Sequence, residues 1–562
     1  MIAAAARAVS LAWLHPVTWD EIEFYRATQW VADGLVPFRD FWEHHTPLQW
    51  FVFAPVAAFV SSPGVAAIIA MRWAQVPLWM GTFVALFFLM RDRSVSARLG
   101  AILLAICSSM FMLAAVEYRI DSLGCAAYVV ALLLLQQKRP FWAGVCLCLA
   151  GFANIRLGPL IVVTMIVQRF RAVEDSRPPL SRQPRSAVLH EIAGGAIAFF
   201  VCASYFLVTE SAVISFRSVW TDNYLADKLA QGPRWMFLHR LAVPFGVRPL
   251  ESVGPLFSPG AIDIATIAII LLGLPAFIRG IRRGEGLAIL QIANIAFIAM
   301  MKFIHHYHFE IAILLMLPYV AAQLERINWR AAMAVLLLAS AVNVYASVFR
   351  GKEDDMRYED FVMRQVDART TNTVFDGVGR ALRRRPAYRY WFLPALQNVL
   401  EASGRFEPYR PRELPDAIIA DYRVYGYLRT HPQLARTFTS HYLPLWRNLW
   451  IPAFTSRGSA DWIAPVDGTY VVIKSEALAS HAWFRHPLEI GVFDTNVPPL
   501  DLRGADRSVT LTVSRGQRLH VDAPANIAVF IVPANEPIWF RQPPHGVTLD
   551  GVAPAVTHIP HF

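Results

Sequence analysis

Residues 261–278, AIDIATIAIILLGLPAFI, decide the fold of this chain. A helix of this length extends over about 27 Å, close to the hydrocarbon core of a bilayer at about 30 Å. Arg279, Arg282 and Arg283 follow at once. Basic residues of this kind mark the cytoplasmic end of a membrane span. The stretch therefore predicts a transmembrane helix with a cytoplasmic carboxyl end.

Similar apolar runs recur through the first 350 residues. They lie at roughly 64–90, 98–116, 121–136, 187–208, 285–302, 309–324 and 331–348, with a hairpin-like pair at 140–168. The shorter run at 3–15 is interpreted as the end of a first span, with a cleavable signal peptide as the alternative. Because the 562 residues are 55% hydrophobic and only 17% charged, the chain is too apolar for a soluble enzyme of this size.

The basic links between the runs predict the topology, since cytoplasmic loops collect Lys and Arg. The links alternate correctly if the run at 48–62 does not cross and lies at the outer interface as a juxtamembrane helix. Eleven spans result, with the N-terminus inside. All the polar clusters described below then face the non-cytoplasmic side.

Charge and cysteine content exclude other classes. The net charge of +10 could suggest nucleic acid, but much of the Lys and Arg sits in the short links, so no nucleic-acid partner is expected. The five cysteines lie in apolar runs and lack metal-ligand spacing, which argues against a disulfide framework or a zinc motif. Walker and dinucleotide-binding motifs are absent as well.

Beyond about residue 350 the composition changes to charged, aromatic and proline-rich segments with alternating strand-like runs. We predict a membrane domain over 1–350 and a soluble periplasmic domain over 351–562. Within the latter, 351–440 reads as mixed α/β and 441–562 as β-rich. Strand signals occur at 417–421, 469–473 and 527–532.

The stretch WDEIEFY at residues 19–25 places two adjacent carboxylates, Asp20 and Glu21, just after the first apolar run. Charge next to a bilayer is costly and usually functional. One interpretation is a general base, or an anchor for a metal or an acceptor. The alternative is that the carboxylates cap the N-terminus of a helix.

Further polar residues are expected beside this pair. Glu117, Arg119 and Asp121 form a turn between two spans, either at the mouth of a cavity or as a solvated turn with a local ion pair. Arg156 interrupts an apolar hairpin, where a guanidinium needs an anion: a ligand phosphate or carboxylate, or an internal salt bridge to Asp121 or Glu117.

A histidine-rich step joins two later spans, and it consists of Lys302, His305, His306, Tyr307 and His308. These residues could bind zinc, hold a phosphate or lie at the membrane interface. Taken together, the outer face offers acids to activate a hydroxyl and cations to neutralise a departing phosphate. A transferase with a lipid-phosphate donor requires that combination.

The chain resembles GT-C-type integral-membrane glycosyltransferases, in particular the group of protein O-mannosyltransferases and lipid A aminoarabinose transferases. The resemblance covers about residues 1–350. It is carried by Trp19-Asp20-Glu21 with Tyr25, Gly34, Pro37-Phe38-Arg39-Asp40-Phe41, His45-Thr46-Pro47-Leu48, Arg72, Glu117-x-Arg119-x-Asp121, Arg156-Leu157-Gly158, His306-Tyr307 and Leu317-Pro318.

This resemblance implies a helical polytopic membrane domain of the GT-C type in a bacterial inner membrane, with the active site on the periplasmic face. The donor would be a polyprenyl-phosphate-linked sugar and the acceptor a glycolipid, a polysaccharide or a protein. Asp20 would act as base or orient the acceptor, with Glu21 beside it. The donor phosphate or sugar would be held by Arg119, Asp121, Arg156, His45, His305, His306 and Tyr307.

One position departs from the family pattern. Thr46 precedes Pro47 where some relatives carry a lysine-bearing step, so the charge contact of that lysine must come from His44, from His45 or from no residue at all. Further contacts could come from Glu43, Glu117, Lys302 and His308. The sequence requires no cofactor, although a divalent metal could bind if Asp20, Glu21, Glu43 and the histidines converge.

Two other functions are compatible with the pattern. A transporter or flippase of an anionic lipid-linked substrate would use Arg156 and the acidic mouth, but such proteins often show paired repeats and midplane charges. A non-catalytic assembly protein would use the membrane part only as an anchor. The sequence identifies neither the sugar nor the acceptor.

Overall fold

The computed structural model describes residues 2–174, 183–229, 236–247, 257–301, 305–327, 353–369, 373–377, 379–389, 397–420, 422–444, 449–476 and 507–534. The chain divides into two compact units. Residues 1–61 and 67–352 form a helical unit, and residues 62–66 and 353–561 form a second unit. Of the four sheets that the described residues form, three belong to the second unit. Lys302 and the run at 331–348 lie outside the described residues.

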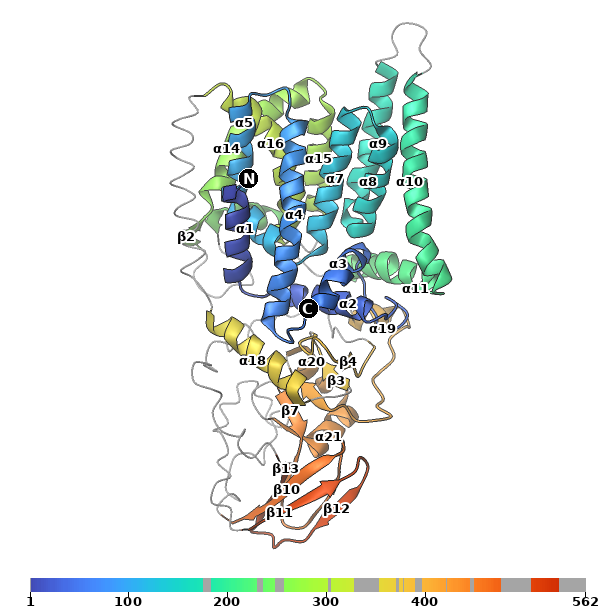
Figure 1. The fold of residues 1–562 in the computed structure, drawn as a ribbon, viewed down its shortest axis with the longest axis vertical. Helices are drawn as coiled ribbons and strands as arrows, with labels where there is room; N and C mark the ends of the chain where they lie inside the picture. The colour runs from blue at the N-terminus through green and yellow to red at the C-terminus, as the bar shows by residue number, and fades with distance from the viewer. Residues whose placement is uncertain are drawn as a thin grey trace. The chain divides into compact units, whose positions relative to one another are not determined.

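The helical unit is built mainly from long apolar helices that run side by side, with α2, α3 and α11 across one end of them (Figure 1). Its α-helices are α1 Ile2–Leu14, α2 Trp19–Ala32, α3 Leu48–Phe59, α4 Val65–Leu89, α5 Val95–Cys107, α6 Ser109–Val116, α7 Ile120–Gln136, α8 Pro140–Ala153, α9 Gly158–Glu174, α10 Gln183–Val208, α11 Ala212–Phe216, α12 Asn223–Leu229, α13 Met236–Ala242, α14 Ile264–Arg282, α15 Gly286–Met300 and α16 Glu310–Leu324. A short antiparallel pair, β1 Phe245–Val247 and β2 Phe257–Ile262, precedes α14.

Helices form where the apolar runs predict them. The run at 261–278 becomes α14, and the short run at 48–62 becomes α3, whose 12 residues are too few to span a bilayer. Among the described residues, three helices are long and apolar enough to cross a membrane, or four if the bent pair α5–α6 is one span. Four more apolar helices are shorter. The number of eleven spans stays a prediction.

The α5–α6 pair bends by 71° at Ser108. The bend leaves backbone donors without helical partners, and side chains satisfy them. The Ser108 hydroxyl accepts from the Phe111 N–H at 3.1 Å and contacts Thr266 Oγ1 at 2.6 Å. Asp263, which caps α14, accepts from the Met110 N–H at 2.8 Å. The bend is therefore fixed by the start of α14.

Helices α8 and α10 pack at very short range because glycines line their contact. A Cβ built on Gly144 would lie 1.8 Å from the Glu191 carbonyl oxygen, and one on Gly194 would lie 2.0 Å from the Phe141 carbonyl oxygen. Only residues without a Cβ allow the backbones to approach this closely. Helix α8 also packs on α7, so α7, α8 and α10 form one packed group, and α8 ends at Asn154.

In the described part of the second unit, helices and strands are mixed up to His441, and only strands follow. Its α-helices are α18 Glu353–Arg369, α19 Gln397–Ala402, α20 Tyr422–Thr430 and α21 Pro432–His441. Its strands are β3 Thr373–Asp376, β4 Arg385–Pro386, β5 Ala417–Ile419, β6 Tyr442–Pro444, β7 Leu449–Pro452, β8 Phe454–Arg457, β9 Ala460–Ile463, β10 Gly468–Ser475, β11 Arg507–Val513, β12 Arg518–Val521 and β13 Ala528–Pro533.

Three sheets arise from these strands. A five-stranded sheet has the order β4-β3-β5-β7-β6, in which β3 pairs in parallel with β4 and β5 while the remaining pairs are antiparallel. A four-stranded antiparallel sheet has the order β11-β10-β13-β8, and β12 pairs with β9. The alternating apolar residues of β10 and β13 contribute to two cores, one on each face.

Candidate active site

Helix α2 begins with a capping arrangement around Glu21. The Glu21 Oε2 atom accepts from the Thr18 N–H at 2.9 Å, so this carboxylate satisfies a backbone donor just before the helix. Asp20 and Glu21 both lie in the first turn, where the helix dipole favours negative charge. Successive residues of a helix point about 100° apart, and the two neighbouring carboxylates accordingly meet different partners.

Glu21 is buried in an ion pair with Arg72 of α4. Both carboxylate oxygens lie 2.6 Å from guanidinium nitrogens, and neither side chain is exposed. Arg72 also donates to the carbonyl oxygens of Ala12, His15 and Pro16. Glu21 thus ties α2 to α4 and to the end of α1, and its oxygens face away from solvent.

Asp20 lies at the surface of the same cluster. Its Oδ2 atom is 2.6 Å from the Nη1 of Arg119, yet 39% of the side chain is exposed. Burial favours the protonated form, but the charge of Arg119 and its hydrogen bond outweigh that effect and lower the pKa of Asp20 to about 2. Asp20 is therefore an accessible carboxylate that is ionised throughout the physiological range.

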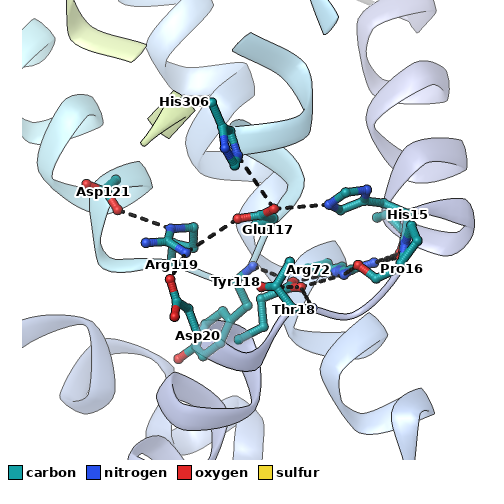
Figure 2. Close-up of polar contacts among 12 residues, drawn as sticks. His15, Pro16, Thr18, Asp20, Arg72, Glu117, Tyr118, Arg119, Asp121 and His306 are labelled. Atoms are coloured by element: carbon teal, nitrogen blue, oxygen red, sulfur yellow. Dashed lines mark hydrogen bonds and ion pairs between the residues drawn. The ribbon is translucent and has the colours of Figure 1, made fainter. Parts of the chain in front are cut away.

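Arg119 is a buried cation surrounded by acids (Figure 2). Besides Asp20, it lies 3.3 Å from an oxygen of Asp121 and 3.5 Å from one of Glu117. Its guanidinium carbon is 3.5 Å from the centre of the Tyr307 ring, a cation–π contact. Burial opposes its charge, but the attraction of Asp20 holds the pKa of Arg119 well above the ordinary value.

Glu117 joins two histidines to this network. Its Oε1 atom lies 3.0 Å from His15 Nε2 and 3.7 Å from His306 Nε2, as Figure 2 shows. Burial works to raise the pKa of Glu117, but the hydrogen bond with His15 and the nearby His306 lower it well below its usual value. Gln75 of α4 fixes this turn by donating to the Glu117 carbonyl oxygen at 2.9 Å.

The break after α8 places Arg156 near Tyr307 as well. Asn154 forms the break: its Oδ1 accepts from the Arg156 N–H at 3.0 Å, and its Nδ2 donates to Asp121 at 2.7 Å. The Arg156 guanidinium lies 5.7 Å from the centre of the Tyr307 ring. Among the described residues no carboxylate lies within 4.0 Å of it, so the internal salt bridge to Asp121 or Glu117 is not formed.

A second polar group lies next to this network and comprises Glu23, Glu43, His44 and His45. Phe24 separates the two groups. Its ring packs edge-on against His45 at 4.8 Å, and the Arg119 guanidinium lies 5.6 Å from its centre. Burial, and then the neighbouring His44, lower the pKa of His45 to about 4. Hydrogen bonds from the two imidazoles hold the pKa of Glu43 far below its usual value although burial opposes this.

The structure thus sorts the residues that we predict from the sequence. Asp20, Arg119, Asp121, Glu117, His306 and Tyr307 form one network, with Arg156 beside Tyr307. His305 precedes the short 3-10 helix His306–Phe309, and His308 lies within it; the His305 N–H donates to His308 Nδ1 at 2.8 Å. Glu21 pairs with Arg72, whereas Glu43, His44 and His45 form the second group. Asp20, Glu21 and Glu43 do not converge on one metal site.

Sequence reasoning missed several members of the site. Glu23 follows Asp20 and Glu21 on the same helix, and this proximity could have marked it. His15 ends the first apolar run just before Pro16, which is a signal of similar strength. Gln75 and Asn154 sit within apolar runs as single amides, and nothing in the sequence indicates that they meet Glu117 and Asp121.

Comparisons with known proteins bear mainly on the fold. No family model matches the sequence, and no curated protein matches it. Among solved structures, the chain is similar to the Archaeoglobus fulgidus oligosaccharyltransferase tethered with an acceptor peptide, at a TM-score of 0.45 and 13% identity over 79% of this chain and 72% of that chain. It is also similar to ArnT from Cupriavidus metallidurans bound to undecaprenyl phosphate, at 0.45 and 12% over 76% and 84%.

A third structure, the archaeal oligosaccharyltransferase AglB in complex with an inhibitory peptide and a dolichol-phosphate, gives a TM-score of 0.44 and 13% identity over 79% of this chain and 72% of that chain.

Proposed function

We propose that the chain is a membrane glycosyltransferase of the GT-C type that moves a sugar from a polyprenyl-phosphate carrier to a glycolipid, polysaccharide or protein acceptor. The observation that supports this most is Arg156, a half-buried cation for which the described part of the chain offers no carboxylate partner. It lies near the same Tyr307 ring as Arg119, the partner of the accessible, ionised Asp20. A cation in an apolar break needs an anion. The donor phosphate supplies one, and the carboxylate faces the acceptor.

The residues divide the chemistry between them. Arg156 binds the phosphate of the donor, and His305 and His306 flank it. The acceptor oxygen attacks the anomeric carbon, the bond from that carbon to the phosphate oxygen breaks, and the phosphate leaves with the electron pair. The proton of a hydroxyl acceptor passes to the departing phosphate as the new bond forms. Positive charge beside the phosphate stabilises this developing charge. His45, His308 and Tyr307 line the surroundings of the same position.

Asp20 orients the acceptor. A carboxylate with a pKa of about 2 is a weak base, so it accepts a hydrogen bond from the acceptor group rather than removing a proton early in the reaction. Its pairing with Arg119 fixes its position. Arg119 in turn is held by Asp121 and Glu117. Glu21 does not contact the substrates, because it is fully buried against Arg72. Its role is to hold α2, and with it Asp20, in place.

The site is proposed to face the periplasm of a bacterial inner membrane. The supporting observation is the distribution of basic residues: Arg91 and Arg93 follow α4, and Arg279, Arg282 and Arg283 lie at the end of α14 or just after it. If these basic links are cytoplasmic, the opposite ends of the helices are periplasmic. Asp20 and Arg119 lie at those opposite ends.

The test compares Arg156→Ala with Arg91→Ala, a control that removes an exposed arginine after the end of α4. Loss of a charge-assisted contact to phosphate should weaken binding of undecaprenyl phosphate by about tenfold or more, measured by native mass spectrometry or calorimetry on the full chain in detergent. Arg91→Ala should bind like the wild type. Equal binding by Arg156→Ala would contradict the proposal.

A second experiment, in cells, identifies the acceptor. In a strain that lacks the gene, mass spectrometry of envelope glycolipids, polysaccharide and periplasmic proteins should show one missing sugar, which the wild-type gene restores and Arg156→Ala does not. An unchanged envelope, together with vesicle assays that show movement of a lipid-linked sugar across the bilayer, would favour a flippase instead.

A further inference from the structure

The second polar group brings four potential metal ligands to one point. Glu23 comes from α2, and Glu43, His44 and His45 come from the loop before α3. One ligand atom from each lies within 4.8 Å of the other three. The Nδ1 atoms of His44 and His45 lie 3.2 Å and 2.9 Å from Glu43 Oε1. They lie 3.9 Å and 3.7 Å from Glu23 Oε1.

These separations match a tetrahedral ion. Bonds of about 2.0–2.1 Å to imidazole nitrogen and carboxylate oxygen, at tetrahedral angles, place the ligand atoms about 3.3 Å apart. The four distances between carboxylate and imidazole atoms, from 2.9 to 3.9 Å, lie on either side of that value.

Burial and hydrogen bonding also indicate a missing ligand. Glu43 is 1% exposed, and its Oε2 atom has no hydrogen-bond partner in the described part of the chain. An uncompensated carboxylate oxygen in such a place is costly. Two carboxylates and two neutral imidazoles carry a charge of −2, which one divalent cation neutralises.

We propose that Glu23, Glu43, His44 and His45 bind one zinc ion. Mixed imidazole and carboxylate ligands in a tetrahedral array favour zinc over magnesium or calcium, which prefer six or more oxygen ligands. The ion joins the loop at 43–45 to α2, whose first turn carries Asp20. Its role is structural, because the site uses four protein ligands and leaves no open position. This inference does not depend on the reaction proposed above.

The decisive measurement is metal content of the full chain purified in detergent without added chelator. Elemental analysis should find about one zinc per chain. Removal with a strong chelator should lower the melting temperature, and zinc chloride should restore it, whereas magnesium chloride should not. Cobalt substitution should give the intense visible bands of tetrahedral Co²⁺. The proposal would be overturned if the chain binds no zinc, or if neither chelator nor zinc changes its melting temperature.

Variants locate the ion. Glu43→Gln and His45→Ala should each weaken zinc binding by at least about tenfold, since even residues that only support ligands have effects of that size. The control is His520→Ala in the second unit, where an exposed histidine lies between Asp461 and Asp522 at 2.9 and 3.0 Å. That variant should keep its zinc. Zinc retained in Glu43→Gln or lost in His520→Ala would refute the assignment, and the cobalt spectrum of the wild type decides the matter if a variant does not fold.

Discussion

At the scale of single residues, the neighbouring acids Asp20 and Glu21 have different roles. Glu21 has no exposed surface and meets Arg72 through both oxygens, whereas 39% of Asp20 is exposed. Removing one partner of a buried ion pair leaves an uncompensated charge in the interior. Removing a half-exposed carboxylate does not, particularly because Arg119 keeps Asp121 and Glu117 as partners.

The two matched amide variants should therefore separate folding from transfer. Glu21→Gln should lower the free energy of unfolding by about 3–5 kcal/mol, whereas Asp20→Asn should abolish transfer and leave the melting temperature within a few degrees of the wild type. Thermal unfolding in detergent and a donor-turnover assay measure the two effects. Full turnover by well-folded Asp20→Asn would show that transfer does not require Asp20.

The dependence on pH follows from the pKa of Asp20. Burial tends to raise this pKa, and Arg119 lowers it to about 2. Because the folded value is below the ordinary value of about 3.9, the pair stabilises the fold above about pH 3.9, and that contribution is lost as the pH falls through about 2. Between pH 5 and 8, protonation of Asp20 should not limit transfer.

Arg119→Gln removes the cause of the lowered pKa and leaves the burial. The pKa of Asp20 should then rise above its ordinary value, and an acidic limb should enter the pH profile of transfer. Arg119→Lys, which keeps the charge, should shift the profile less. Initial rates between pH 4.5 and 8 test this expectation. Residual activity in Arg119→Gln with a profile that matches the wild type would show that Arg119 does not control Asp20.

At the scale of elements, the apolar runs allowed most helices of the first unit to be predicted. The period and length of these runs reflect the bilayer itself, so α4, α7 and α14 begin and end close to the expected residues. The partners of the charged residues could not be predicted in this way. Which acid of the Asp20–Glu21 pair faces α4 depends on the rotation of α2, and the rotation depends on packing that joins residues about 50 to 100 positions apart.

The grouping of Glu23 with His44 illustrates the same difficulty. The two residues are brought together by the turn after α2, where Phe38 adopts a positive φ of 68°. A phenylalanine rarely adopts this conformation, and nothing in the sequence marks it. The strands of the second unit were easier to predict, because β10 contains four consecutive apolar residues and β13 contains five.

The contact between α8 and α10 gives a prediction at this scale. Gly144→Ala would place a Cβ 1.8 Å from a backbone oxygen of Glu191, so the helices must separate at a cost of about 1–3 kcal/mol. Transfer should also fall, because α8 leads directly to the break that places Arg156. Gly81→Ala is the control: no atom lies within 4 Å of its Cβ, and it should be neutral or slightly stabilising. Equal stability of the two variants would contradict the close packing.

At the scale of the whole molecule, Asp20, Arg119 and Arg156 all belong to the first unit. The second unit has its own sheets and cores, and we propose that it recognises the acceptor. Removal of residues 353–562 should therefore preserve binding of undecaprenyl phosphate and reduce transfer to the native acceptor. Membrane insertion and donor binding are the controls. Undiminished transfer by the truncated chain would exclude this role.

The ion pair of Arg72 also bears on how the chain is made. An arginine in the apolar α4 adds about 2.5–3.5 kcal/mol to the cost of inserting that helix by itself. Glu21 and the carbonyl oxygens of Ala12, His15 and Pro16 precede Arg72 in the sequence. They therefore leave the ribosome first. The partners of Arg72 are therefore synthesised before α4 is inserted, so the order of synthesis favours formation of this ion pair next to the active site.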